Sequence, residues 1–72
     1  MNKDPRTPMA KLATRLDLHL RMNHIRKADF ALAAGISRPC LDSILRGNER
    51  TAICTLEKVA VAMDRDLWEL LR

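Results

Sequence analysis

Apolar residues recur every three or four positions along most of this 72-residue chain, which is the spacing of one buried face of an α-helix. Typical helix boundaries interrupt the repeat: Thr7-Pro8 is a start, and Gly35 and Gly47-Asn48 are ends. Strand-forming residues are scarce, so the predicted fold class is all-α. Five short helices are expected, at residues 8–22, 27–34, 38–46 and 52–63, with a last one from Asp66.

Capping side chains set the expected boundaries more closely. Thr7 and Ser37 can accept hydrogen bonds from backbone N–H groups at the starts of the first and third helices. Asp66 and Glu69 have the spacing of a capping box at the start of the last helix. Asn23 is expected to take the left-handed conformation that ends the first helix.

The apolar faces of these helices predict one small core in one domain, residues 8–72, preceded by a flexible polar arm at residues 1–7. A chain of this length buries only about 60% of the surface that it exposes when unfolded. Leu18 and Met22 fall outside the apolar face of the first helix, so we expect an exposed patch or a contact with a later segment. The predicted core residues are Met9, Leu12, Ala13, Leu16, Leu20, Phe30, Ala31, Ala34, Leu41, Ile44, Leu45, Ile53, Leu56, Val59, Ala60, Met63, Leu67, Leu70 and Leu71.

Composition argues against membrane proteins and against proteins that stack single-stranded bases. No apolar run approaches the ~18 residues of a membrane span, and the N-terminal sequence lacks the apolar stretch of a signal peptide. The expected location is therefore the cytoplasm, with no membrane contact. Phe30 and Trp68 are the only aromatic residues apart from histidine, and single-strand binders depend on aromatic platforms.

Cysteine and histidine spacing predicts neither a disulfide framework nor a metal site. Cys40 and Cys54 are too few for a disulfide scaffold and are expected to be buried or half-buried free thiols. His19 and His24 stand five apart, which is not the i, i+4 spacing of a metal pair on a helix. The chain also has no glycine-rich phosphate loop and no nucleophile paired with a base. No enzyme activity, cofactor or metal is expected.

Basic residues gather at the start of the chain. Residues 1–27 hold seven lysines and arginines against two aspartates, a local charge of +5, whereas the whole chain carries +4. This distribution suggests an anionic partner, nucleic acid first. The alternative is that the charge only keeps a small protein in solution.

One stretch of the sequence, KADFALAAGISRPCLDSILRG, has small, glycine and apolar residues at the spacing of two helices joined by a tight turn. Ala31 stands four residues before Gly35, where a small side chain lets two helices approach closely. Gly35 suits a turn that requires a positive φ, and Ile36 fills the space between the helices. Two further residues anchor the second helix of the pair: Leu41 and Ile44.

In these residues the chain resembles the phage repressor and Cro (Xre-type) family, the lambda repressor-like helix-turn-helix DNA-binding proteins. The resemblance covers about residues 9–71 and implies a compact five-helix domain. Leu20 and Leu45 stand where family members often pair an arginine with a glutamate, so apolar packing is expected to replace that ion pair. Other positions also depart from the family pattern: Arg26, Lys27, Ala52 and Asp64.

The resemblance implies that the helix at 38–46 reads base edges in the major groove of double-stranded DNA. Arg38 can form a bidentate contact with guanine O6 and N7, Ser43 can donate or accept a hydrogen bond, and Pro39 can contact a thymine methyl. Asp42 either accepts from cytosine N4 or orders an arginine. Alternatively, Arg38, Asp42 and Arg46 form a solvated ladder of ion pairs at i, i+4 and i+8.

The implied function is a sequence-specific transcriptional regulator, a repressor, that binds its operator as a homodimer. Trp68 is expected to anchor the dimer interface with Leu71, or else to fold back over Met63 or the first helix and cover the core. The alternative function is an antitoxin-like or other protein-interaction module that binds a toxin or effector through exposed Leu18, Met22 and Trp68. The residues expected to contact phosphate are Arg26, Lys27, Asn48, Arg50 and Thr51.

Overall fold

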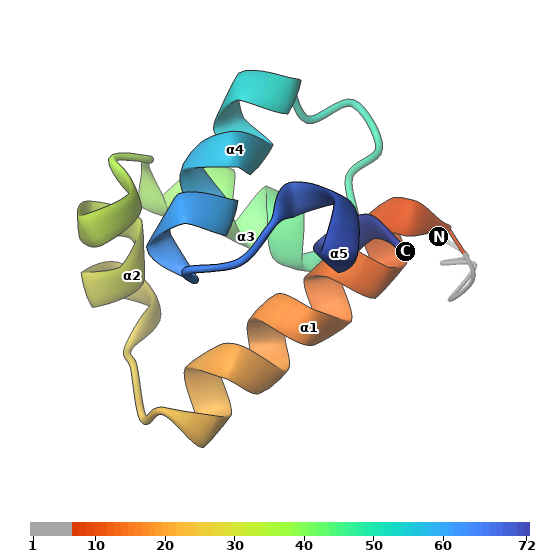
Figure 1. Cartoon of the computed structure of the whole chain (residues 1–72). Helices are drawn as coiled ribbons and strands as arrows, with labels where there is room; N and C mark the ends of the chain where they lie inside the picture. The colour runs from red at the N-terminus through yellow and green to blue at the C-terminus, as the bar shows by residue number, and fades with distance from the viewer. Residues whose placement is uncertain (1–6) are drawn as a thin grey trace.

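The computed structural model describes residues 7–72, which form five α-helices and no strand (Figure 1). The all-α class and the five helices predicted from the sequence are confirmed. Residues 1–6 of the predicted arm lie outside the described residues. The helices are α1 (Pro8–Met22), α2 (Lys27–Ala34), α3 (Arg38–Leu45), α4 (Ile53–Ala62) and α5 (Leu67–Leu71).

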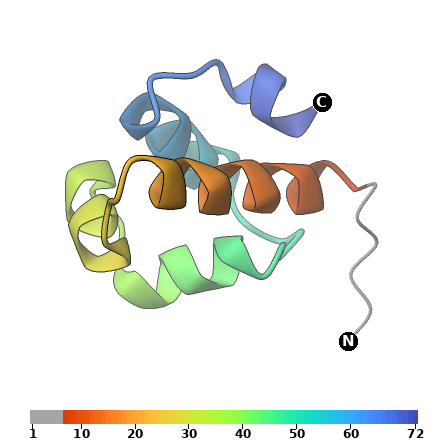
Figure 2. The same ribbon diagram turned by 90° about the horizontal axis from the view of Figure 1, so that it is seen from below.

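Helix α1 runs between two other helices. It packs against α3 on one side and against α5 on the other, while α2 packs against both α3 and α4, and α4 against α5. Figure 2 shows α3 below α1, with α4 and α5 above it. The surface on the α3 side of α1 is therefore separate from the surface on its α5 side.

The core lies where the apolar faces of the helices meet. Its fully buried side chains are Leu12, Leu16, Leu41, Ile44, Val59 and Leu70. Most of the predicted core is confirmed, but Ile53 is 57% exposed, because it is the first residue of α4, one turn before buried Leu56. Leu45, Leu67 and Leu71 are only half-buried, and each packs against the edge of the core.

Side-chain caps begin α1, α3 and α5 as predicted. The Thr7 hydroxyl accepts from the Ala10 N–H at 3.1 Å, and the Ser37 hydroxyl accepts from Cys40 N–H at 3.2 Å. The Asp66 carboxylate accepts from the Trp68 N–H at 3.0 Å, two residues on, rather than from Glu69 as a capping box requires.

A residue with a positive φ follows each of the helices α1 to α4, one or two positions after its last residue. The expectation for Asn23 was wrong: its φ is −102°, and the next residue, His24, takes the left-handed conformation instead. The cause is a 2.9 Å hydrogen bond from Ile25 N–H to Leu20 C=O, which closes the helix one residue later. The four left-handed residues are His24 (55°), Gly35 (73°), Gly47 (77°) and Asp64 (56°).

Within residues 7–72, no helix combines the length and the apolar character that crossing a bilayer requires. The longest helix, α1, has 15 residues.

Candidate nucleic-acid interface

A three-residue turn, Gly35 to Ser37, joins α2 to α3 and fixes their relative orientation. Gly35 has φ 73° and ψ 32°, as the sequence predicted, and its N–H donates to Leu32 C=O at 3.2 Å. The Ile36 N–H reaches back to Ala31 C=O at 3.0 Å, and the Ile36 side chain packs against the core. The turn is therefore held by backbone hydrogen bonds and by apolar contact together.

Helix α3 buries one face and presents the other to solvent. Leu41 and Ile44 are fully buried, so the residues at the remaining positions form an outward stripe. Of the residues expected to face bases, Arg38, Pro39 and Arg46 are exposed, and Asp42 and Ser43 are half-buried. Arg46 is not in the helix as predicted but caps its C-terminus.

Arg38 and Asp42 form an ion pair one helical turn apart, with Arg38 Nε 3.2 Å from Asp42 Oδ1. Of the possible ladder of ion pairs from Arg38 through Asp42 to Arg46, only this first pair forms. Arg46 makes no ion pair with any residue between 7 and 72. The pairing uses Arg38 Nε and leaves both terminal nitrogens of the guanidinium for another acceptor. Asp42 thus orders the Arg38 side chain along α3.

Asn48 organises the loop between α3 and α4. Its amide nitrogen donates to Ser43 Oγ at 2.8 Å, its side-chain oxygen accepts from Arg50 N–H at 3.0 Å, and its carbonyl accepts from the Thr51 hydroxyl at 2.8 Å. That Asn48 and Thr51 contact phosphate stays a prediction; in the structure their polar groups bond to Ser43 of α3 and within the loop. One sequence pattern could have predicted that Asn48 organises the loop. An asparagine in a turn often accepts a hydrogen bond from the backbone N–H two residues later.

The cations expected to contact phosphate fall into two groups. Arg26 is paired, since its Nε lies 3.0 Å from Asp29 Oδ2 at the start of α2. Lys27 and Arg50 are exposed and form no ion pair with a described residue. Unlike α1, α3 and α5, helices α2 and α4 begin without a side-chain cap, at Arg26 and Ala52. Their first N–H groups remain available to an acceptor.

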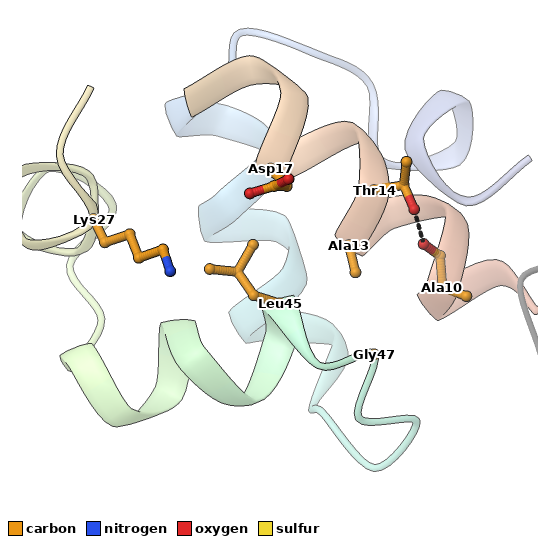
Figure 3. A pocket seen from close by; sticks show the side chains of 7 residues that line it. All are labelled: Ala10, Ala13, Thr14, Asp17, Lys27, Leu45 and Gly47. Carbon is orange, nitrogen blue, oxygen red and sulfur yellow. Dashed lines mark hydrogen bonds between the residues drawn. The ribbon is translucent and has the colours of Figure 1, made fainter. Parts of the chain in front are cut away.

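A pocket of about 420 Å³ lies between α1, the end of α3 and the start of α2 (Figure 3). Leu45 points into it from α3, with Asp17 of α1 above and the Lys27 side chain extending toward it. Leu20 is buried and does not line this pocket, so a contact between Leu20 and Leu45 stays a prediction. On the far side, the loop at Gly47 passes close to α1, since a Cβ there would lie 3.8 Å from Ala10 Cα.

Trp68 lies on α5 with 70% of its surface exposed, so the alternative in which it covers the core is wrong. Leu71, its expected partner in an interface, is half-buried against the core. The other singled-out residues lie away from α3: His19 meets the Phe30 ring edge-on at 6.3 Å, and Cys54 is exposed rather than buried. The described part of the chain contains no cluster of three or more His, Cys, Asp or Glu side chains placed to hold a metal ion.

Comparison of the chain with models of protein families, with curated proteins and with solved structures finds no significant match.

Proposed function

We propose that this protein is a sequence-specific double-stranded DNA-binding regulator of transcription, with a lambda repressor-like helix-turn-helix formed by α2 and α3. The observation that carries the proposal is the Arg38–Asp42 pair on the exposed stripe of α3. An α-helix fits the major groove, and arginine is the commonest reader of guanine there. Pro39, Ser43 and Arg46 add apolar and polar contacts along the same stripe.

Phosphate contacts in this proposal come from residues outside α3. Lys27 stands at the uncapped start of α2, and Arg50 stands in the loop before the uncapped start of α4. Helix N-termini and unpaired cations both bind phosphate oxygens. Arg26 supplies a further cation if it leaves Asp29, while Asn48 and Thr51 hold the loop that carries Arg50. As a repressor in the cytoplasm, the protein occupies an operator and blocks transcription.

Selection of bound sequences from a random duplex pool tests the proposal most directly. We expect a short enriched half-site containing guanine, because Arg38 reads that base. Two half-sites about 34 Å apart are expected if two copies bind side by side. A pool that stays random after several rounds would contradict sequence-specific recognition.

The proposed dimer places Trp68 of two copies against each other, with Leu71 beneath. A single helix-turn-helix reads few base pairs, so pairing extends the site, and an exposed tryptophan is a common interface anchor. Trp68→Ala should convert a dimer to a monomer in sedimentation and leave the thermal midpoint nearly unchanged, because Trp68 lies outside the core. If the wild type is already a monomer at micromolar concentration, the proposed interface is wrong.

A further inference from the structure

A groove of about 560 Å³ runs between the second half of α1 and the segment that joins α4 to α5. Its lining includes Arg15, Leu18 and Met22 from α1, together with Met63, Arg65 and Leu70. None of these residues belongs to the proposed DNA-binding surface. The groove lies on the α5 side of α1, whereas α3 packs against the opposite side (Figure 2).

Two large apolar side chains in this groove are exposed. Leu18 is 57% and Met22 is 71% exposed, and they stand at i and i+4 on one side of α1, about 6 Å apart along the helix axis. Met63 and Leu70, which are buried, form the apolar base of the groove. Exposed apolar side chains gathered over an apolar base are typical of a protein-binding surface, and methionine adapts its shape to a partner.

Positive charge borders the apolar residues. The Arg15 guanidinium donates to the Glu69 backbone carbonyl, not to a carboxylate, and Arg65 has no ion pair with any residue in the described range. Glu69 is the one acidic residue among those lining the groove, and His19 also lines it. The groove therefore combines apolar anchoring points with two cations that form no ion pair with a carboxylate in residues 7–72.

We propose that this groove binds an acidic amphipathic helix of a partner protein. Apolar side chains one turn apart on the partner would pack against Leu18 and Met22, and carboxylates beside them would meet Arg15 and Arg65. A second copy docked groove to groove would bring the same arginines together, so like charges disfavour that occupant. The inference goes beyond DNA binding, since a partner here leaves α3 free.

A synthetic helical peptide of about 16 residues, with leucines at i, i+4 and i+7, a few glutamates beside them and alanines elsewhere, serves as the probe. We expect it to bind the protein in fluorescence anisotropy and to shift the amide signals of Leu18, Met22 and Arg65 in NMR spectra. A peptide with lysine in place of every glutamate should have an affinity lower by about tenfold or more. No binding, or equal binding of both peptides, overturns the proposal.

Variants locate the peptide on the protein. Met22→Ser and Arg65→Ser should each weaken peptide binding by about tenfold. Leu32→Ser is the matched control, because Leu32 is 83% exposed on α2 and does not line the groove. An equal loss in the control, or a change of oligomeric state in Met22→Ser without peptide, would overturn the proposal. Duplex binding by Met22→Ser should match the wild type, so failure of the groove and failure of the DNA proposal are distinguishable.

Discussion

The two sides of α1 differ in what they leave in contact with solvent. On the α3 side, the outward stripe of α3 carries charged and polar groups, and no residue of α3 is among the exposed large apolar side chains. On the α5 side, Leu18 and Met22 are exposed beside two arginines, Arg15 and Arg65, that have no carboxylate partner among the described residues. Phosphate recognition needs cations and N–H groups, whereas protein recognition needs desolvated apolar anchors. The contrast supports the proposal of two partners of different chemistry.

The turns on the two sides of α1 also differ, in the type of residue that adopts a positive φ. Gly35 and Gly47, which flank α3, are the two glycines with positive φ, and glycine takes that conformation without a Cβ penalty. His24 and Asp64 take it at the ends of α1 and α4, and their neighbours Asn23 and Arg65 line the groove. The turns that position α3 are thus free of steric strain, whereas those beside the groove are not.

Salt should separate the two surfaces most strongly. Roughly 4–6 phosphate contacts per copy would lower duplex affinity by about 10²–10³-fold between about 50 and 200 mM salt, because each contact releases counterions. Binding of the acidic peptide should fall far less, since the peptide is no polyelectrolyte and apolar contact contributes to its affinity. Titrations of both ligands at several salt concentrations give the two slopes. A flat response for the duplex would contradict DNA binding through phosphates.

Arg38→Ala should lower the binding free energy for the best duplex by about 1–3 kcal/mol and relax the base preference at one base pair, because it removes a bidentate contact with a base. Arg50→Ala is the comparison, since an unpaired loop cation should weaken all duplexes alike. Affinities for a set of single-base operator variants distinguish the two patterns. If Arg38→Ala weakens every sequence equally, Arg38 contacts phosphate and the assignment to a base is wrong.

Most of the fold followed from the sequence because local signals agreed with the packing. Thr7, Ser37 and Gly35 each carry a short-range signal for a cap or a turn, and each takes the expected conformation. The failures arose where neighbours decide. Asn23 lost the left-handed position to His24 through one backbone hydrogen bond, and Ile53 has the spacing of the core but lies at the end of its helix.

The candidate site was harder to predict, because polar side chains choose among partners that spacing does not reveal. The sequence allowed a ladder from Arg38 through Asp42 to Arg46, and only the first pair forms. Asn48 is predicted to contact phosphate, and spacing alone did not reveal the three hydrogen bonds that join its side chain and carbonyl to Ser43 of α3 and to the loop. Such choices depend on three-dimensional proximity and not on residue type alone.

Leu45→Glu should destabilise the protein by about 1–2 kcal/mol, through loss of partly buried apolar contact on the α3 side of α1. A larger loss, about 3–5 kcal/mol, would follow from a buried charge without a partner. Here Lys27 extends toward the same pocket and can pair with the new carboxylate (Figure 3). Denaturant unfolding measures the difference, and Leu45→Gln provides the uncharged control.

Adding Leu20→Arg to Leu45→Glu tests whether the two positions are neighbours. Recovery of part of the lost stability would support the predicted replacement of an ion pair by apolar contact. A double variant that is no more stable than the single one would show that residues 20 and 45 do not meet.

The smallest expected effect tests the strain on the groove side of α1. Asp64→Gly should stabilise the protein by about 0.5–1 kcal/mol, because glycine adopts a φ of 56° without the Cβ clash, although it also gains entropy when unfolded. His24→Gly should act in the same direction.

Gly35→Ala should do the opposite and lower the free energy of unfolding by about 1–2 kcal/mol. The cause is the positive φ alone, since nothing lies within 4 Å of the added Cβ. Thermal unfolding resolves these changes, because about 1 kcal/mol moves the midpoint of a domain this small by about 4–8 °C. If Asp64→Gly lowers the midpoint instead, the aspartate side chain stabilises the turn by more than its backbone strain costs, and the contrast between the two pairs of turns does not hold.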